Sequence, residues 1–139
     1  MVSHTFTFRV RYAETDQMGT FYNARALEWF EVGRSELSRS MGLPYTEWEK
    51  RGAFLPLVEA GVKFKGTARY DDLLEMRVWT VEAGRVRLRF EYEIRHAGDN
   101  GRLVATGFTV HPLVDAQMRP MRLPDWVRSS MGLDGDAEA

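Results

Sequence analysis

The sequence predicts an α+β fold in which one long helix lies against a five-stranded antiparallel sheet. Three observations lead to this prediction. One long stretch has helical periodicity, five stretches have strand-like patterns, and short turns join most of the strands. Strands with one polar face favour antiparallel pairing, and the long helix must cover the apolar face of the sheet because that face has to be buried.

Five stretches of the chain are predicted strands: residues 6–12, 54–65, 73–82, 86–95 and 103–114. The fourth is the clearest, because its apolar residues alternate with charged ones throughout, which leaves one face polar. Pro56 lies near the start of the second strand and indicates an edge position or a bulge. A Gly-Asp-Asn-Gly sequence at 98–101 predicts a hairpin turn, since Asn-Gly accepts the positive φ angles that such turns require.

The long helix is predicted from about Thr20, its expected N-cap, to Met41, with Gly42 as the residue that ends it. One face repeats at helical spacing and comprises Ala26, Leu27, Phe30, Gly33, Arg34, Leu37 and Met41. Gly33 costs about 1 kcal/mol of helix stability relative to alanine. A close approach between the helix and the sheet would explain a glycine at this position. Trp29 and Phe30 are interpreted as core residues.

Two shorter helices are predicted at 44–52 and 123–131, the second with Pro124 and Asp125 in its first turn. The chain contains no linker, repeat or low-complexity segment. We therefore expect one domain over residues 1–131, which is an ordinary domain size. Residues 132–139 are acidic and are expected to form a disordered tail.

The composition excludes several classes of function. The chain of 139 residues has no cysteine, which excludes disulfides, thiol nucleophiles and cysteine-based metal sites. A net charge of −1 and the lack of a basic stripe or helix-turn-helix pattern argue against nucleic-acid binding. No apolar run is long enough to span a membrane, and no secretory signal is visible, so a cytoplasmic location is expected. The histidines, at positions 4, 96 and 111, lack metal-ligand spacing, so no metal site is predicted.

Asp16 is the strongest candidate for a catalytic group, because it lies in the loop before the long helix. With Thr20 as N-cap, the backbone amides of Phe21, Tyr22 and Asn23 would be free donors at the positive end of the helix dipole. Such donors can bind a carbonyl oxygen that develops negative charge. A carboxylate slightly upstream can then attack that carbonyl or deprotonate a water molecule. In the competing interpretation, Thr15 or Asp16 only caps a turn.

Two segments carry a resemblance to a known family. Residues 11–34 (RYAETDQMGTFYNARALEWFEVGR) contain a Thr-Asp, a glycine three residues later, an asparagine and an aromatic-rich helix that ends in arginine. Residues 68–75 (ARYDDLLE) resemble the family's link into its third strand. Together with the strand order, they resemble hotdog-fold acyl-CoA thioesterases of the 4-hydroxybenzoyl-CoA thioesterase type. The resemblance covers roughly residues 5–130, and it implies a sheet wrapped around the long helix.

The resemblance implies hydrolysis of an acyl-CoA thioester, with coenzyme A as part of the substrate and no separate cofactor. Asp16 would be the catalytic carboxylate, as nucleophile or as general base. Asn23 would donate its backbone N–H to the thioester carbonyl. Tyr22 would line the acyl pocket.

The resemblance also implies a homodimer or a dimer of dimers, with each active site between two protomers. Leu57, Val58 and Glu59 would reach the site from the partner protomer. Arg69, and also Lys65, would bind the phosphates of coenzyme A.

The chain departs from the family's pattern at one feature. Many relatives have a histidine directly after the glycine or near the asparagine, whereas this chain has Thr20 and Tyr22 there, so one of these would have to position water. This departure leaves a non-catalytic acyl-CoA-binding or regulatory protein as an alternative function. An enoyl-CoA hydratase with the same fold is the other alternative. The hydratase pattern requires a histidine five residues after the aspartate, where this chain has Phe21. Glu14 is a rival to Asp16 as the catalytic carboxylate.

Overall fold

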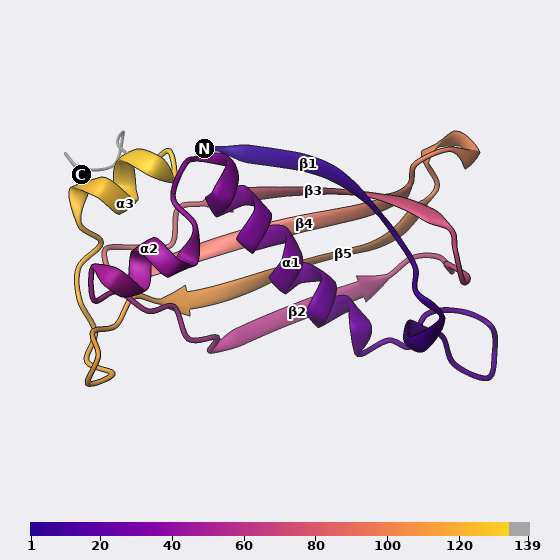
Figure 1. The fold of residues 1–139 in the computed structure, drawn as a ribbon, viewed down its shortest axis with the longest axis horizontal. Coiled ribbons are helices and arrows are strands. Elements are labelled where there is room, and N and C mark those ends of the chain that lie inside the picture. The colour runs from indigo at the N-terminus through magenta and orange to yellow at the C-terminus, as the bar shows by residue number, and fades with distance from the viewer. Residues whose placement is uncertain (134–139) are drawn as a thin grey trace.

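The computed structural model describes residues 1–133, apart from the side chain of Asp99, and its strands form one antiparallel sheet (Figure 1). The strands are β1 (Ser3–Arg9), β2 (Glu59–Phe64), β3 (Leu73–Val81), β4 (Arg87–His96) and β5 (Leu103–Pro112). Their order is β1-β3-β4-β5-β2, so β1 and β2 are the two edges. The long helix α1 (Arg25–Ser40) crosses one face of the sheet, and α2 (Tyr45–Lys50) and α3 (Asp125–Ser130) are short. Within residues 1–133, no helix is both long and apolar enough to cross a membrane.

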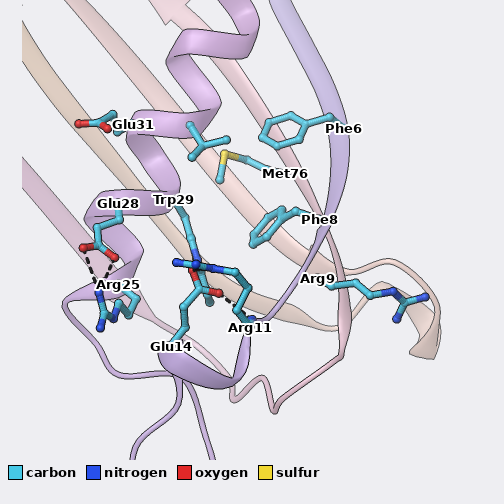
Figure 2. Close-up of a pocket in the computed structure, with 11 residues that line it drawn as sticks. Phe6, Phe8, Arg9, Arg11, Glu14, Arg25, Glu28, Trp29, Glu31 and Met76 are labelled. Atoms are coloured by element: carbon cyan, nitrogen blue, oxygen red, sulfur yellow. Dashed lines mark hydrogen bonds and ion pairs between the residues drawn. The ribbon is translucent and has the colours of Figure 1, made fainter.

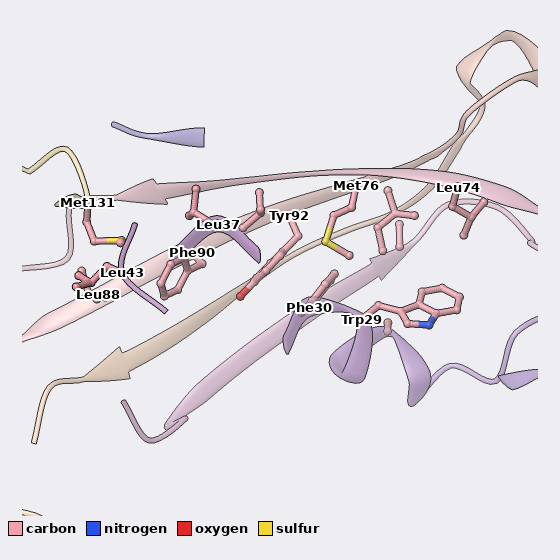
Figure 3. Packing of buried hydrophobic residues seen from close by; sticks show 14 of the residues in the cluster. Trp29, Phe30, Leu37, Leu43, Leu74, Met76, Leu88, Phe90, Tyr92 and Met131 are labelled. Carbon is pink, nitrogen blue, oxygen red and sulfur yellow. The ribbon is translucent and has the colours of Figure 1, made fainter. Parts of the chain in front are cut away.

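The core forms between α1 and the alternate residues of β3 and β4 that face it (Figure 3). Phe30 is fully buried and its ring stacks on Tyr92 with 4.1 Å between the ring centroids. A Cβ atom on Gly33 would overlap the sulfur of Met76. The prediction that Gly33 permits a close approach of helix and sheet is therefore confirmed. Trp29 is also buried, in agreement with its interpretation as a core residue.

The predicted start of the long helix is wrong. The helix begins at Arg25, with Ala24 as N-cap, and Thr20 does not cap it. The Thr20 hydroxyl instead donates to the carbonyl of Ala68 and accepts from its N–H, both at 3.3 Å, which ties this segment to Ala68. The buried face differs from the prediction at Leu27, which stays 40% exposed. Gly42 follows the helix with a φ of 76°, as predicted for a residue that ends a helix.

Two strand boundaries also differ from the predictions, whereas the turn predicted at 98–101 does join two antiparallel strands. β1 ends at Arg9 because the chain turns into a short 3-10 helix, η1 (Tyr12–Glu14), so Tyr12 is not part of the strand. β2 begins at Glu59 and not at Phe54, which forms only an isolated bridge with Val114. At 99–101 the chain forms a 3-10 turn, and Asn100 has the expected positive φ of 57°. At the C-terminal end, Leu133 is buried against the domain, and the rest of the predicted tail, residues 134–139, lies outside the described residues.

A buried polar chain connects the sheet to the segment that leads into β2. Tyr92 and Thr109 share a hydrogen bond of 2.6 Å between their hydroxyl groups, and Thr109 Oγ1 lies 2.9 Å from Nε2 of His111. The other ring nitrogen of His111 lies 3.3 Å from the carbonyl oxygen of Leu55, to which it donates. His111 is fully buried. Burial, with a smaller effect from the nearby charge of Arg34, lowers the pKa of His111 to about 4.

We expect stability to depend on pH through His111. In the unfolded chain the imidazole has a pKa of about 6.5, so between about pH 6.5 and pH 4 the unfolded state binds a proton that the folded state does not. The free energy of unfolding should therefore fall by up to about 3 kcal/mol as the pH drops through this window. Urea denaturation at several pH values will measure the fall, which should be smaller in His111→Asn than in wild type. An equal fall in both proteins would contradict the assignment, and His4→Asn is the matched control.

Candidate active site

Asp16 lies in a closed loop between η1 and α1. Thr15 and Phe21 pair as an isolated antiparallel bridge, and the N–H of Asp16 donates to the carbonyl of Thr20 at 2.9 Å. Gly19 allows the loop to close because it has a φ of 82°, which side chains other than glycine rarely adopt. Oδ1 of Asp16 accepts a hydrogen bond of 2.9 Å from the N–H of Met18. Among residues 1–133, Oδ2 of Asp16 has no hydrogen-bond partner, so it is available to a substrate or a water molecule.

The backbone amides before α1 do not all behave as predicted. The amide of Phe21 donates to Ala68 and that of Tyr22 to Glu14, both at 2.8 Å, so these two are not free. Asn23 and Ala24 have no acceptor for their N–H groups within the described part of the chain. The helix itself then begins with amides that bond backward to Tyr22, Asn23 and Ala24. The free donor predicted at Asn23 is therefore present, next to the positive end of the helix dipole.

Three of the other predicted site residues lie near the Asp16 loop. Tyr22 is 56% exposed beside Asn23, and the guanidinium of Arg69 lies against Gly19, since a Cβ there would be 3.1 Å from Nη1. Thr20 lies in the same loop, but its hydroxyl is bonded to the backbone of Ala68. These residues lie close to Asp16 along the loop and the segment that supports it.

Leu57, Val58 and Glu59 are not brought to Asp16 within one chain. The far end of β2 is near the loop, because the ring of Phe64 lies 6.1 Å from that of Phe21 between centroids. Glu59 lies at the opposite end of the strand, about 17 Å away at the usual rise per residue. Lys65 follows β2 and is exposed at the end nearer the loop.

Glu14, the rival carboxylate, is buried and both of its oxygen atoms are bonded (Figure 2). Oε1 accepts from the backbone N–H of Arg11 at 2.8 Å. Oε2 accepts from Nε1 of Trp29 at 2.9 Å and lies 3.4 Å from Nε of Arg11. Because neither oxygen is free to attack a substrate, Glu14 does not replace Asp16 as the candidate nucleophile or base. Local sequence patterns do not reveal this bond, since Trp29 is fifteen residues away from Glu14.

A hollow of about 480 Å³ lies between β1 and α1 (Figure 2). Its apolar wall comprises Phe6, Phe8, Trp29, Val32 and Met76, and charged side chains surround it: Arg9, Arg11, Glu14, Arg25, Glu28 and Glu31. Arg25 and Glu28 pair at 2.9 Å on its rim. Asp16 does not line this hollow, so the hollow is separate from the candidate catalytic loop. Within residues 1–133, no three carboxylate or imidazole groups are close enough together to bind a metal ion.

Comparisons with known proteins agree with this fold. The family described as the Thioesterase-like superfamily matches residues 10–131 of the chain. YneP of Bacillus subtilis (strain 168), named as a candidate acyl-CoA thioesterase, is 33% identical over 122 residues, which cover 84% of this chain and 87% of YneP.

Solved structures are also similar. The crystal structure of Slr0204 from Synechocystis, described as a 1,4-dihydroxy-2-naphthoyl-CoA thioesterase, matches with a TM-score of 0.85 and 26% identity, over 96% of this chain and 98% of that one. A hypothetical protein from Thermus thermophilus matches with a TM-score of 0.84 and 33% identity, over 95% of this chain and 97% of that one.

The fold and these matches define a hotdog-fold protein. The chain belongs to the thioesterase-like superfamily. The predicted resemblance to hotdog-fold thioesterases of acyl-CoA is therefore confirmed, together with the enzyme class that it implies.

Proposed function

We propose that this chain hydrolyses the thioester bond of an acyl-CoA, with Asp16 as the catalytic carboxylate and the backbone N–H of Asn23 as the donor to the thioester carbonyl. One observation carries the proposal: an unpaired oxygen of Asp16 and an unpaired amide of Asn23 lie on the same short loop, next to the start of α1. A thioester needs both features, because its carbonyl carbon must be polarised before a nucleophile attacks it.

The reaction follows from these two groups. The carbonyl oxygen accepts the N–H of Asn23, and the partial positive charge at the helix terminus stabilises the negative charge that develops on it. In one route Oδ2 of Asp16 attacks the carbon, the thiolate of coenzyme A leaves, and water hydrolyses the resulting anhydride. In the other route Asp16 accepts a proton from a water molecule whose oxygen attacks the carbon; the C–S bond then breaks and the proton passes to the departing thiolate. Both routes yield a carboxylic acid and the free thiol of coenzyme A.

The surrounding residues support an acyl-CoA as substrate. Exposed Tyr22 provides an aromatic surface for the acyl group beside the Asn23 amide. Arg69 lies against the loop at Gly19, where its guanidinium can bind a phosphate of coenzyme A. Relatives named for 1,4-dihydroxy-2-naphthoyl-CoA and for acyl-CoA support the same substrate class. The engagement of the Thr20 hydroxyl with Ala68 favours Tyr22 over Thr20 as the residue that contacts substrate.

We also propose that the working protein is a homodimer, or a dimer of such dimers, in which β2 pairs with β2 of the partner. The strand is an unpaired sheet edge, and an exposed edge is a template for pairing. Apolar side chains are exposed along it: Leu57 is 46% exposed, Val58 55% and Phe64 45%. Antiparallel pairing about a two-fold axis would bring Leu57, Val58 and Glu59 of one protomer toward the Asp16 loop of the other.

Asp16→Asn tests the catalytic carboxylate. The amide neither attacks nor accepts a proton, so we expect kcat/KM on a panel of acyl-CoAs to fall by about 10²- to 10⁴-fold, measured by release of the thiol. Asp125→Asn, at the distant start of α3, is the matched control and should retain full activity. Activity of Asp16→Asn within severalfold of wild type would refute the assignment. Tight acyl-CoA binding by wild type without thiol release would instead favour the non-catalytic binding protein.

Replacement of Asn23 tests whether its backbone or its side chain acts. Asn23→Ala keeps the N–H group and should keep kcat within about threefold of wild type, whereas Asn23→Pro removes it and should lower kcat by about 10²- to 10³-fold. Circular dichroism and a melting curve will establish that the proline variant folds. A large loss of activity in Asn23→Ala would assign the function to the side chain.

Charge at the β2 edge tests the dimer. Wild type should have a mass of about 32 kDa by light scattering, twice the 16.0 kDa of the chain, or about 64 kDa if two dimers associate. Val58→Glu replaces an exposed apolar side chain with a charged one inside the proposed interface, where burial of the charge is costly, so we expect monomers and a parallel loss of activity. Met118→Glu changes an exposed apolar residue elsewhere and should remain dimeric and active. A monomeric, fully active wild type would contradict the proposal.

A further inference from the structure

We propose that Glu14 is a positioning residue, whose buried carboxylate fixes the Asp16 loop and the Asn23 amide relative to helix α1. This inference rests on the proposed thioester hydrolysis. It assigns to Glu14 a role distinct from attack or proton transfer, because both of its oxygen atoms are already bonded. Its effect on the reaction passes through the two groups that it places.

The carboxylate of Glu14 connects two elements that the sequence separates. Oε2 accepts from the indole N–H of Trp29, in the second turn of α1, at 2.9 Å. Oε1 accepts from the N–H of Arg11, just after the end of β1, at 2.8 Å (Figure 2). The indole of Trp29 packs between the rings of Phe8 and Phe21, and its ring centroid lies 5.2 Å and 4.8 Å from theirs, respectively. A rigid, buried indole is therefore the anchor to which the loop is bonded.

The backbone of Glu14 controls the other end of the same loop. Its carbonyl oxygen accepts the N–H of Tyr22 at 2.8 Å. Asp16 follows Glu14 by two residues, and Asn23 follows Tyr22 directly. The base of the loop that carries both reacting groups is thus closed at Glu14, once through its main chain and once through its side chain. A shift of this residue would move the Asp16 carboxylate and the Asn23 amide relative to each other.

The burial of Glu14 adds to this interpretation. Only 5% of its surface is exposed, and an ionised carboxylate is costly to bury unless donors compensate it. Here two N–H donors and the guanidinium of Arg11, at 3.4 Å, provide that compensation. The Arg11 side chain is 70% exposed, so the constraint on the loop comes mainly from the two hydrogen bonds to the buried carboxylate. The arrangement therefore suits a residue whose function is orientation.

Glu14→Gln and Trp29→Phe test the proposal, singly and together, with acyl-CoA in a thiol-release assay. The side-chain amide in Glu14→Gln offers an acceptor to only one of the two donors, and a phenyl ring lacks the N–H, so each change should release the loop. We expect kcat to fall about 10- to 100-fold while KM stays within about threefold, since misplacement of reacting groups affects the chemical step. Because residues 14 and 29 are proposed to act through the same loop, the loss in the double variant should be smaller than the product of the two single losses.

Two controls separate orientation from general damage. Glu36→Gln, on the exposed face of α1, removes a carboxylate that pairs with Arg39 and should leave kcat unchanged. The indole proton of Trp29, followed by NMR, should shift in Glu14→Gln because its acceptor changes. If Glu14→Gln does not fold, Trp29→Phe alone still tests the bond through its kcat and KM.

The outcomes distinguish this inference from the proposed function. Full activity of Asp16→Asn would overturn the proposed function, and the role of Glu14 with it. An inactive Asp16→Asn together with a folded Glu14→Gln of unchanged kcat would overturn the role of Glu14 alone. Multiplicative losses in the double variant would also overturn it, because they would show that the two residues act separately.

Discussion

The close contact between α1 and the sheet determines where every other feature of the molecule lies. It depends on two glycines, one on each side of the contact. Gly33 leaves room on the helix for the side chain of Met76, and Gly107 leaves room on β5 for the ring of Phe30. Any side chain at 107 would collide with that ring and with the carbonyl of Gly61 on β2. These two contacts fix how closely α1 approaches the sheet and where it crosses the sheet. They therefore also fix the position of the helix N-terminus.

The contact between α1 and the sheet also determines the position of the candidate site. Trp29 is one residue from Phe30, so the packing that fixes the phenyl ring also fixes the indole that bonds to Glu14. The loop that carries Asp16 is attached to the indole on one side and to the backbone of Ala68 on the other. Loops that bear reacting groups are effective when a rigid scaffold supports them, and here the support comes from the core itself.

Local periodicity was enough to predict the architecture but not the details of the site. The alternation in 86–95 and the turn at Asn100 indicated the strands and their antiparallel pairing, because both signals are local in the chain. The start of α1 was misplaced because Thr20 bonds to Ala68, 48 residues away, and no local pattern reveals such a partner. For the same reason the sequence indicates Glu14 only as a rival carboxylate to Asp16. Asp16 and Asn23 could be proposed because a loop before a helix is a local signal, whereas their relation to a partner protomer lies outside one chain.

The two edges of the sheet differ, and this difference bears on how many copies can assemble. The β2 edge is apolar near both of its ends, whereas the outward-facing side chains of β1 are Ser3, Thr5, Thr7 and Arg9. Arg9 also donates to the carbonyl of Asp71 at 2.8 Å, close to the end of that edge. When like edges pair about a two-fold axis, both β2 edges are covered, and the β1 edges that remain expose polar side chains on the face away from α1. The sheet then stops growing at two protomers, because the β2 edge through which they associate is no longer open to a further chain. An open-ended fibre therefore does not form through β2.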